Sequence, residues 1–592
     1  MKTPALVALL GSLALTSFAA TPLLPPAGDG TEQSTPPADY RIVHSFLGKD
    51  GDAPNWLIQG RDGFFYGTTF SGGPHTEFPD GAGVIFRVDS AGNFTVLHSF
   101  GLIDGYIPSG LMQAQDGSFY GTTLAGGSSS GTGAGTLFRM DVTGALTTLH
   151  AFDGGQNCCD GGVPNGPPIQ GADGKFYGVT FNGGAIRDAD HPLGFGTVYR
   201  YDPSNGLLTI IHSFDLADGN GINPNGPLRQ GSDGFLYGTT GVGGGVFRMD
   251  TAGNLTLLHA ITDSNEPLAG LIQAADGALY GTTDGPPGTV FRIDTASNYS
   301  LLNRFDGLDG SGLTAPVTQA SNGSFYGTAQ QGGLLDPLAG DLFQIDSSGA
   351  LRVLHSFTQS DTKSGYLPFA PLIQGNDGAL YGTTASGGDK GHGAIFRLDL
   401  SIPQPIASVV LQPPAILPGG QSSATVTLAL PAQATTTVTL ATNASDLTIP
   451  ASVQIAKGAS SATFTVGALA NASNGDDRVY ASINGQATRA ILTVGASQAA
   501  LSSFTVTPST VVGGNAVRGT VILTAPAPAG GAAVVLSANS SSITMPATVT
   551  VPAGKTNASF SVKTRRVRAT TIAALTASYS GSNLNANVTI TP

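Results

Sequence analysis

Residues 372–384, LIQGNDGALYGTT, contain the signature that decides the fold of this chain. Its Tyr-Gly-Thr segment occurs seven times within the first 400 residues, with Val179 replacing Thr in the third copy. Successive copies lie 43 to 60 residues apart and begin at Tyr66, Tyr120, Tyr177, Tyr237, Tyr280, Tyr326 and Tyr381. Self-similarity at such a period is typical of propellers and solenoids.

Each repeat is expected to form four β-strands. In the first copy these strands are residues 57–59, 64–69, 84–89 and 94–100. Pairs such as Asp62-Gly63 between apolar runs suit tight hairpins, because Gly and Asp tolerate positive φ. The second and third strands are apolar on both faces, so each sheet must be covered on both sides. Propeller blades meet this condition because each one packs between two neighbours.

The two ends of the repeat region predict how a ring would close. The seventh copy stops near Asp399 without a fourth strand. Residues 41–46, RIVHSF, match the fourth strand of the first copy, residues 95–100, TVLHSF. The N-terminal strand is therefore expected to complete the last sheet, which an open solenoid would not require. We predict an all-β chain with a seven-bladed β-propeller over residues 39–400.

The repeat unit resembles the GloVer tandem-repeat family of secreted bacterial proteins, described as choice-of-anchor proteins. The match comprises LIQGNDGALYGTT, the pair Gly387-Gly388 and GAIF at residues 393–396. The resemblance implies a cell-surface or extracellular protein and no particular activity. The chain departs from the family pattern by ending at Pro592 without a Leu-Pro-x-Thr-Gly signal, which argues against covalent anchoring.

Beyond Pro403 the composition changes towards Ala, Thr, Val and Ser, and two copies follow at an offset of 96 residues. The offset relates Pro450, Gly458 and Phe464 to Pro546, Gly554 and Phe560. Alternating apolar and polar residues in both copies indicate strands. We predict Ig-like β-sandwiches at residues 403–495 and 497–592, which resemble adhesin-type Ig-like modules of bacterial surface proteins and would act as a stalk.

The N-terminus predicts export. Lys2, an apolar run over residues 5–15 and small residues at positions 17 and 19 indicate a signal peptide at residues 1–19, followed by a Pro-rich linker at 20–38. No later segment is long and apolar enough to span a bilayer, so no transmembrane anchor is expected in the mature chain. The net charge of -13 and the lack of a basic patch argue against nucleic-acid binding. We expect a secreted or cell-surface monomer.

Three sets of polar residues recur in the repeats. Glutamines on the presumed innermost strand either line a central channel or form a hydrogen-bonded ring between blades: Gln59, Gln113, Gln170, Gln230, Gln273, Gln319 and Gln374. Histidines on the fourth strand, expected to be packed rather than metal-bound, are His44, His98, His150, His212, His259 and His355, with Asn303 as the exception. Asp89 and its counterparts follow an Arg such as Arg87 by two residues, which suits an ion pair or a turn cap.

The two cysteines, Cys158 and Cys159, are adjacent. After export they could form a strained vicinal disulfide, pair with another chain or stay as thiols. Two neighbouring side chains without further ligands do not make a metal site.

Catalytic, cofactor-binding and metal-binding residues are not predicted, and no cofactor is expected. Glu occurs only at positions 32, 77 and 266, and no nucleophile elbow, phosphate loop or zinc motif is present. We expect a non-enzymatic binding or adhesion protein whose propeller head recognises an extracellular glycan or protein. The alternative is an extracellular carbohydrate-active hydrolase or lyase. Ligand contacts are expected in the most divergent loops, residues 71–83, 126–135, 154–165 and 182–196.

Overall fold

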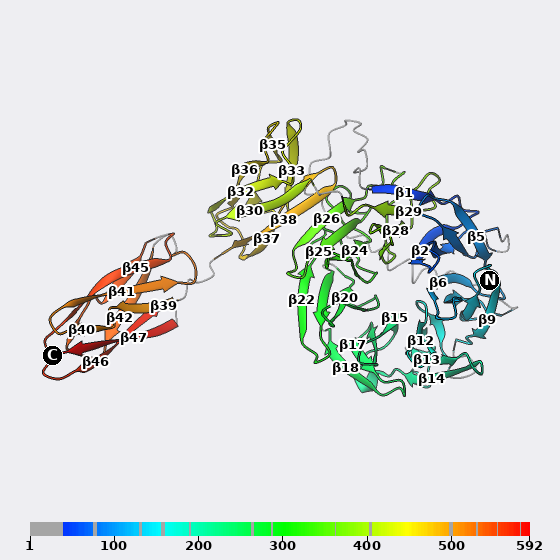
Figure 1. Cartoon of the computed structure of the whole chain (residues 1–592), viewed down its shortest axis with the longest axis horizontal. Coiled ribbons are helices and arrows are strands. Elements are labelled where there is room, and N and C mark those ends of the chain that lie inside the picture. Colours follow the sequence, from blue (N-terminus) through cyan, green and yellow to red (C-terminus); the bar gives the residue numbers. More distant parts are fainter. Residues whose placement is uncertain are drawn as a thin grey trace.

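The chain folds into a ring of sheets followed by two further β units (Figure 1). The computed structural model describes residues 40–592 except 75–77, 79, 129–132, 155–159, 189–190, 262–265, 286–287, 362, 402–404, 496–500, 528–530, 553 and 580–581. Within this described part, the secondary structure consists of strands and one 3-10 turn, η1 (Leu216–Asp218). The chain is therefore all-β, with a propeller-like repeat region.

Each repeat forms one antiparallel sheet, and the first strand of each lies towards the inside of the ring while the fourth lies outside (Figure 1). Repeats one and two contain β2 (Asp52–Gln59), β3 (Phe65–Ser71), β4 (Val84–Val88), β5 (Phe94–Ser99), β6 (Tyr106–Gln113), β7 (Phe119–Ala125), β8 (Thr136–Met140) and β9 (Leu146–Ala151). Repeats three and four contain β10 (Gly162–Pro164), β11 (Ile169–Gln170), β12 (Phe176–Asn182), β13 (Thr197–Asp202), β14 (Leu207–Ser213), β15 (Pro224–Gln230), β16 (Leu236–Thr240), β17 (Gly245–Met249) and β18 (Leu255–Ala260).

The remaining three repeats follow the same order, and the last one takes its fourth strand from the N-terminus. Repeats five and six contain β19 (Ile272–Gln273), β20 (Leu279–Thr283), β21 (Thr289–Ile293), β22 (Tyr299–Arg304), β23 (Thr318–Gln319), β24 (Phe325–Ala329), β25 (Asp341–Ile345) and β26 (Leu351–Ser356). Repeat seven contains β27 (Ile373–Gln374), β28 (Leu380–Thr384), β29 (Ala394–Leu398) and β1 (Tyr40–Ser45). The pairing runs from Tyr40 opposite Leu398 to Ser45 opposite Ala394, so the closure predicted for residues 41–46 is confirmed.

Aromatic side chains hold neighbouring sheets together. At four of the seven junctions the Tyr of one repeat packs against a Phe at the start of the next repeat's second strand, with ring centroids 4.3 Å apart for Tyr66 and Phe119. The other three repeats have Leu at that position. The same contact closes the ring, because Tyr381 packs on Phe65 at 4.1 Å. All of these rings are buried, so each sheet is covered on both faces as its apolar pattern predicted.

The remaining residues of the Tyr-Gly-Thr signature are also used by the fold. Only Gly fits at the second position, because the aromatic ring of the third strand lies directly over it. A Cβ on Gly281 would be 2.4 Å from Cζ of Phe291. The Thr hydroxyl donates to the next sheet, as Thr383 does to the carbonyl oxygen of Pro54 at 2.9 Å. The signature thus describes blade packing rather than a ligand site.

Replacing Gly281 by Ala is expected to destabilise the head. A methyl group at 2.4 Å from Phe291 forces the ring or the backbone to move, and overpacking of this kind costs about 1–3 kcal/mol. Thermal unfolding of the full chain measures the effect. The double variant Gly281→Ala, Phe291→Leu should regain part of the loss, and an unchanged melting temperature for Gly281→Ala alone would contradict the steric explanation.

Two strand units follow the ring, each formed by two sheets around a single core. The first C-terminal unit contains β30 (Ile406–Gln412), β31 (Ala415–Ile416), β32 (Gln421–Leu428), β33 (Thr436–Thr442), β34 (Leu447–Thr448), β35 (Ser452–Ile455), β36 (Ser461–Ala468), β37 (Gly475–Ile483) and β38 (Gln486–Val494). The second contains β39 (Leu501–Thr507), β40 (Thr510–Val512), β41 (Ala516–Leu523), β42 (Ala532–Ala538), β43 (Ile543–Thr544), β44 (Thr548–Val551), β45 (Asn557–Thr564), β46 (Thr571–Tyr579) and β47 (Ser582–Thr591).

The first C-terminal unit is not separate from the head. Strand β38 pairs with the outer strand β26, with Val353 opposite Ala487, so one sheet of the unit continues the sheet of repeat six (Figure 1). Tyr480 and Ala487 also belong to the same buried cluster as Phe305 and Val353 of the head. Strand pairing and a shared core therefore join the first unit of the predicted stalk to the ring.

Candidate functional site

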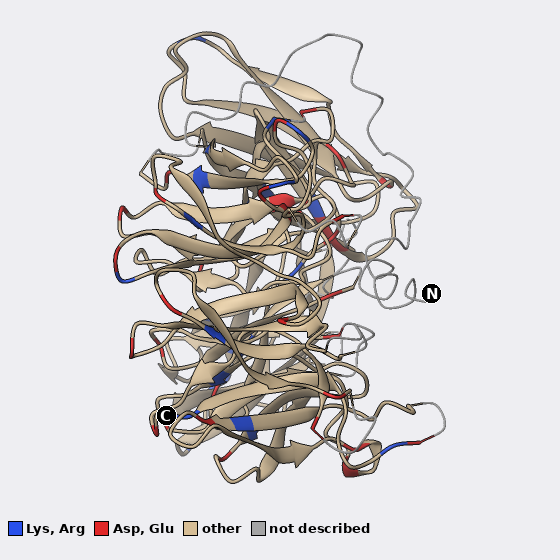
Figure 2. Cartoon of the chain, turned by 90° about the vertical axis from the view of Figure 1, so that its right-hand side faces the viewer, with Lys and Arg blue, Asp and Glu red and all other residues tan. Residues whose placement is uncertain are grey.

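The head has two faces with different connections (Figure 2). We call the face with the turns between first and second strands and between third and fourth strands the turn face. The opposite face, the loop face, holds the connections between second and third strands and those that lead from one sheet to the next. Because antiparallel strands alternate in direction, these two kinds of connection always emerge on the same side.

Carboxylates organise the turn face in each repeat. The hydroxyl of Tyr66 donates to Asp62 at 2.7 Å, and Asp62 also accepts the N–H of Phe64. Burial, with a further contribution from this hydrogen bond, raises the pKa of Tyr66 to about 12. In repeat six the amide of Asn322 donates to Tyr326 instead, at 2.8 Å. Tyr66 is therefore a neutral structural donor, whereas the Tyr326 hydroxyl accepts the corresponding bond.

The recurring Asp and Arg side chains also serve the turns. Asp89 accepts the N–H groups of Ala91 and Asn93, both at 2.9 Å, which makes it a turn cap. The preceding Arg reaches the other turn of its repeat, as in the pair of Arg292 and Asp276 at 3.1 Å. Of the two roles predicted for this Asp, the turn cap recurs in the repeats. The ion pair with the preceding Arg is seen for Asp399 and Arg397.

The glutamines occupy the inner edge of the turn face and bond to backbone groups on both sides. Each Oε1 accepts an N–H from the turn of the preceding repeat at 2.8–3.0 Å. Each Nε2 donates to a Gly carbonyl of its own turn at 2.8–3.3 Å. The bond from Asn376 to Gln59 joins repeat seven to repeat one, so the hydrogen bonds form a closed ring.

The histidines lie at the other end of the sheets, under the loop face. In three repeats Nε2 contacts an Asp in the following connection: His44 with Asp50 at 3.2 Å, His98 with Asp104 at 2.6 Å, and His150 with Asp160 at 2.9 Å. His355 is instead buried and stacks on Tyr40, and burial lowers the pKa of His355 to about 4. The packed role predicted for these histidines is confirmed at these positions.

Exposed aliphatic side chains concentrate on the loop face. Among the described residues of the head, eight exposed large apolar side chains lie on its connections: Leu47, Ile103, Ile186, Leu193, Leu216, Val242, Leu335 and Leu338. Ile103 reaches 72% exposure. At the turn face the comparable residues are Val142, at 55%, and Leu207 at the start of β14, at 59%. The six residues from Leu47 to Val242 belong to repeats one to four and to the connection that joins repeat seven to repeat one.

The backbone at the inner rim of the loop face is strained in the same repeats. Five residues other than Gly adopt a left-handed conformation with φ of 51–58°: Ala53, Ile107, Val163, Asn223 and Leu367. Each N–H donates to the loop of the preceding repeat at 2.8–3.1 Å. For Ile107 and Val163, whose side chains are β-branched, this conformation is unusual and costs energy. We therefore identify the loop face over repeats seven, one, two, three and four as the candidate site and call it the binding arc.

Other candidate chemistry is not assembled in the described residues. No group of three or more His, Cys, Asp or Glu side chains is placed to hold a metal ion there. No helix within the described part is long and apolar enough to cross a membrane. Cys158 and Cys159 lie outside the described residues. A crevice of about 140 Å³ beside β26 is below the usual size of a small-molecule pocket.

The repeat sequence matches a known family model. The Gloeobacter/Verrucomicrobia repeat aligns with residues 27–240, 130–287 and 284–410, which together span well over half of the 592 residues. The chain belongs to this family. The resemblance to GloVer repeats drawn from the sequence is thereby confirmed.

Comparison of this Gloeobacter/Verrucomicrobia repeat protein with curated proteins finds no match. Among solved structures, a streptogramin B lyase shares 16% identity over 61% of this chain and 97% of its own, with a TM-score of 0.43. The virginiamycin B lyase from Staphylococcus aureus shares 14% identity over 61% and 99%, with a TM-score of 0.44. The D0-D1 domain of intimin shares 14% over 32% and 99%, with a TM-score of 0.14. At these values, none of the likenesses assigns an activity to the chain.

Proposed function

We propose that this chain is a secreted or cell-surface binding protein that recognises an extracellular macromolecule through the binding arc. In this proposal the head is a seven-bladed β-propeller, and the C-terminal units are Ig-like β-sandwiches. Residues 1–19 act as the signal peptide and residues 20–38 as a linker. The proposal rests on one observation: exposed aliphatic side chains and strained backbone gather on the same part of one face.

The contrast between the two faces supports recognition on the loop face. Side chains repeated on the turn face are occupied by their own turns and by the glutamine ring, which leaves few groups for a ligand. The loop face instead carries connections that differ between repeats, and the described parts of residues 71–83, 126–135, 154–165 and 182–196 belong to them; 75–77, 79, 129–132, 155–159 and 189–190 lie outside the described residues. Variable loops on a rigid scaffold are the usual carriers of binding function.

The chemistry of the arc favours a protein surface over a small molecule. Leu47, Ile103 and Leu216 are aliphatic and project from separate connections, which suits a broad apolar contact. The inner rim adds a pair of half-buried aromatic rings, Phe70 and Phe369, 5.5 Å apart between centroids. A glycan with apolar and polar edges remains the second ligand class to test.

A substitution of matched chemistry on each face tests the proposal. Ile103→Asp on the loop face is expected to weaken binding by about tenfold or more, which corresponds to roughly 1.4 kcal/mol. Val142→Asp on the turn face places the same charge at a similarly exposed position and should leave binding unchanged. Binding of the full chain to arrays of extracellular proteins and glycans provides the measurement.

Two outcomes would contradict the proposal. Equal loss of binding in both variants would show that the arc is not the recognition surface. Release of reducing ends or unsaturated products from polysaccharides by the wild-type chain would support the alternative of a hydrolase or lyase.

A further inference from the structure

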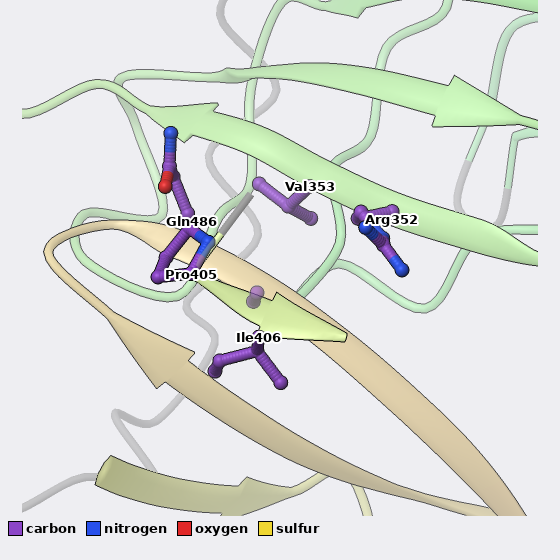
Figure 3. A pocket seen from close by; sticks show the side chains of 6 residues that line it. Arg352, Val353, Pro405, Ile406 and Gln486 are labelled. Carbon is purple, nitrogen blue, oxygen red and sulfur yellow. The ribbon is translucent and has the colours of Figure 1, made fainter. Parts of the chain in front are cut away.

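The contact between the head and the first C-terminal unit involves one repeat that departs from the others. Strand pairing alone does not explain why β38 joins β26, because every fourth strand in the ring has an outer edge. The backbone contact is also short: Arg352 lies opposite Thr488 and Val353 opposite Ala487, and Ser356 donates its N–H to Gly485 at 3.0 Å. Val353 and Gln486 border the small crevice at this junction (Figure 3). Side chains must therefore select the site.

The connection after repeat five contains an Asp in the same setting as those that pair with histidines elsewhere. Asp309 follows position 303 by six residues, as Asp104 follows His98. One carboxylate oxygen of Asp309 accepts the N–H of Asp306 at 2.9 Å, just as Asp104 accepts the N–H of Gly101 at 2.8 Å. The residue at position 303, however, is Asn rather than His.

Asn303 makes only one of the two interactions that the imidazole ring of a His makes at this position. Its Nδ2 donates to the carbonyl oxygen of Gly349 at 2.8 Å, which corresponds to the bond between Nδ1 of His212 and the carbonyl oxygen of Gly253. Asn303 has no atom at the position where Nε2 of a His would contact Asp309, so another group can bind there. Arg489 of the first C-terminal unit fills it: the guanidinium forms an ion pair with Asp309 and donates to Oδ1 of Asn303 at 2.7 Å.

The ion pair between Asp309 and Arg489 is buried. The side chain of Asp309 is 0% exposed and that of Arg489 is 7% exposed. A second anchor lies beside it, where the hydroxyl of Tyr480 donates to Asp306 at 2.7 Å. Arg478 also donates to the carbonyl oxygen of Arg304 at 2.9 Å. A buried carboxylate without a partner would be strongly unfavourable, and Arg489 supplies that partner to Asp309.

We infer that the connection after repeat five is a dedicated docking site for the hairpin β37–β38, and that Asn303 is the residue that selects this repeat. Where a repeat keeps its His–Asp pair, the carboxylate already contacts the imidazole and offers no open site for Arg489. The second C-terminal unit cannot compete, because the positions 96 residues after Arg478, Tyr480 and Arg489 are Ala574, Thr576 and Asn585. The head and the first unit thus form one body.

Substitution of Asn303 by His in the full chain tests this inference. The new imidazole should pair with Asp309 and displace Arg489, so the first unit detaches. Amides at positions 486–489 should then exchange hydrogen about tenfold faster or more, and small-angle scattering should show a longer particle. His98→Asn makes the reverse change in a repeat without a docked unit, and its scattering profile should match that of the wild type.

A second pair of variants separates docking from folding. Arg489→Ala leaves Asp309 buried without a cation and should lower the melting temperature of the head. Adding Asn303→His should restore that temperature while the first unit stays detached, because the imidazole supplies the missing partner. Wild-type exchange rates in Asn303→His, or no rescue in the double variant, would overturn the inference.

Discussion

Deletion of residues 40–46 is expected to convert the head into an aggregation-prone, largely unfolded protein. These residues supply the fourth strand of repeat seven and bury Tyr40 at 4% and Phe46 at 0% exposure. Loss of two buried aromatic side chains alone costs roughly 6 kcal/mol or more, which is comparable to the whole stability of many domains. The deletion also opens the edge of β29 to pairing with other chains. Size-exclusion chromatography and thermal unfolding measure both effects.

The matched control removes residues 20–38, which precede β1 and are expected to be a linker. This variant should elute and melt like the mature chain. If the chain without residues 40–46 eluted and melted in the same way, pairing by β1 would not contribute to the stability of the ring. Contacts between neighbouring sheets, such as Tyr66 with Phe119, would then be sufficient to hold the seven sheets together.

The sequence predicted the ring because each repeat carries local information. Alternation in the strands, Gly in the tight turns and the spare strand at residues 41–46 are all visible without knowledge of the partner residues. The same reasoning predicted packed histidines, such as His355, which stacks on Tyr40. These inferences concern contacts that recur in the repeats, so that equivalent positions in different repeats can be compared within one sequence.

Structural features that occur in a single repeat could not be predicted by comparing the repeats. The docking of the first C-terminal unit depends on Asn303, which is visible as a break in the histidine series, but its partner Arg489 lies 186 residues further along the chain. The six-residue spacing of His98 and Asp104 was the available signal for the carboxylate. The left-handed residues of the binding arc gave none, because Ile107 and Val163 are residue types that normally avoid this conformation.

The docked unit and the binding arc lie over different repeats, and this separation has a consequence for recognition. Repeats five and six carry the unit through Asp309 and β26, whereas the left-handed residues occur in repeats seven, one, two, three and four. A macromolecule on the arc would therefore meet a head whose attachment to the rest of the chain is already fixed. In the proposed function, docking sets the direction in which the loop face points, and the binding arc makes the contact.

Replacement of Asp341 by Thr is expected to stabilise the protein at pH 8 and to have little effect near pH 4. Asp341 is fully buried at the start of β25, with Ser356 donating to one carboxylate oxygen, while the other is without a hydrogen-bond partner among the described residues. Three other repeats have Thr there, bonded to a second Thr, as Thr289 is to Thr283 at 2.7 Å. Repeat six has Ala329 at the second position, so this pair is lost.

The pH dependence follows from the direction of the pKa shift. Burial raises the pKa of Asp341 to about 7, and the bond from Ser356 only partly opposes this. In the unfolded chain the carboxyl titrates near 3.9. Between these values the folded state holds a proton that the unfolded state has released, so stability falls as the pH rises, by up to about 1.4 kcal/mol per pH unit. Above pH 7 the loss is complete.

Thermal unfolding of the wild type, Asp341→Thr and the exposed control Asp389→Asn from pH 4 to pH 8 measures this dependence. Other carboxylates act in the opposite direction, since hydrogen bonds from Ser401 hold the pKa of Asp399 at about 2. The informative quantity is therefore the difference between wild type and variant at each pH. This difference should grow from pH 4 to pH 7 for Asp341→Thr and stay flat for Asp389→Asn. A flat difference for both would mean that Asp341 titrates near its ordinary value.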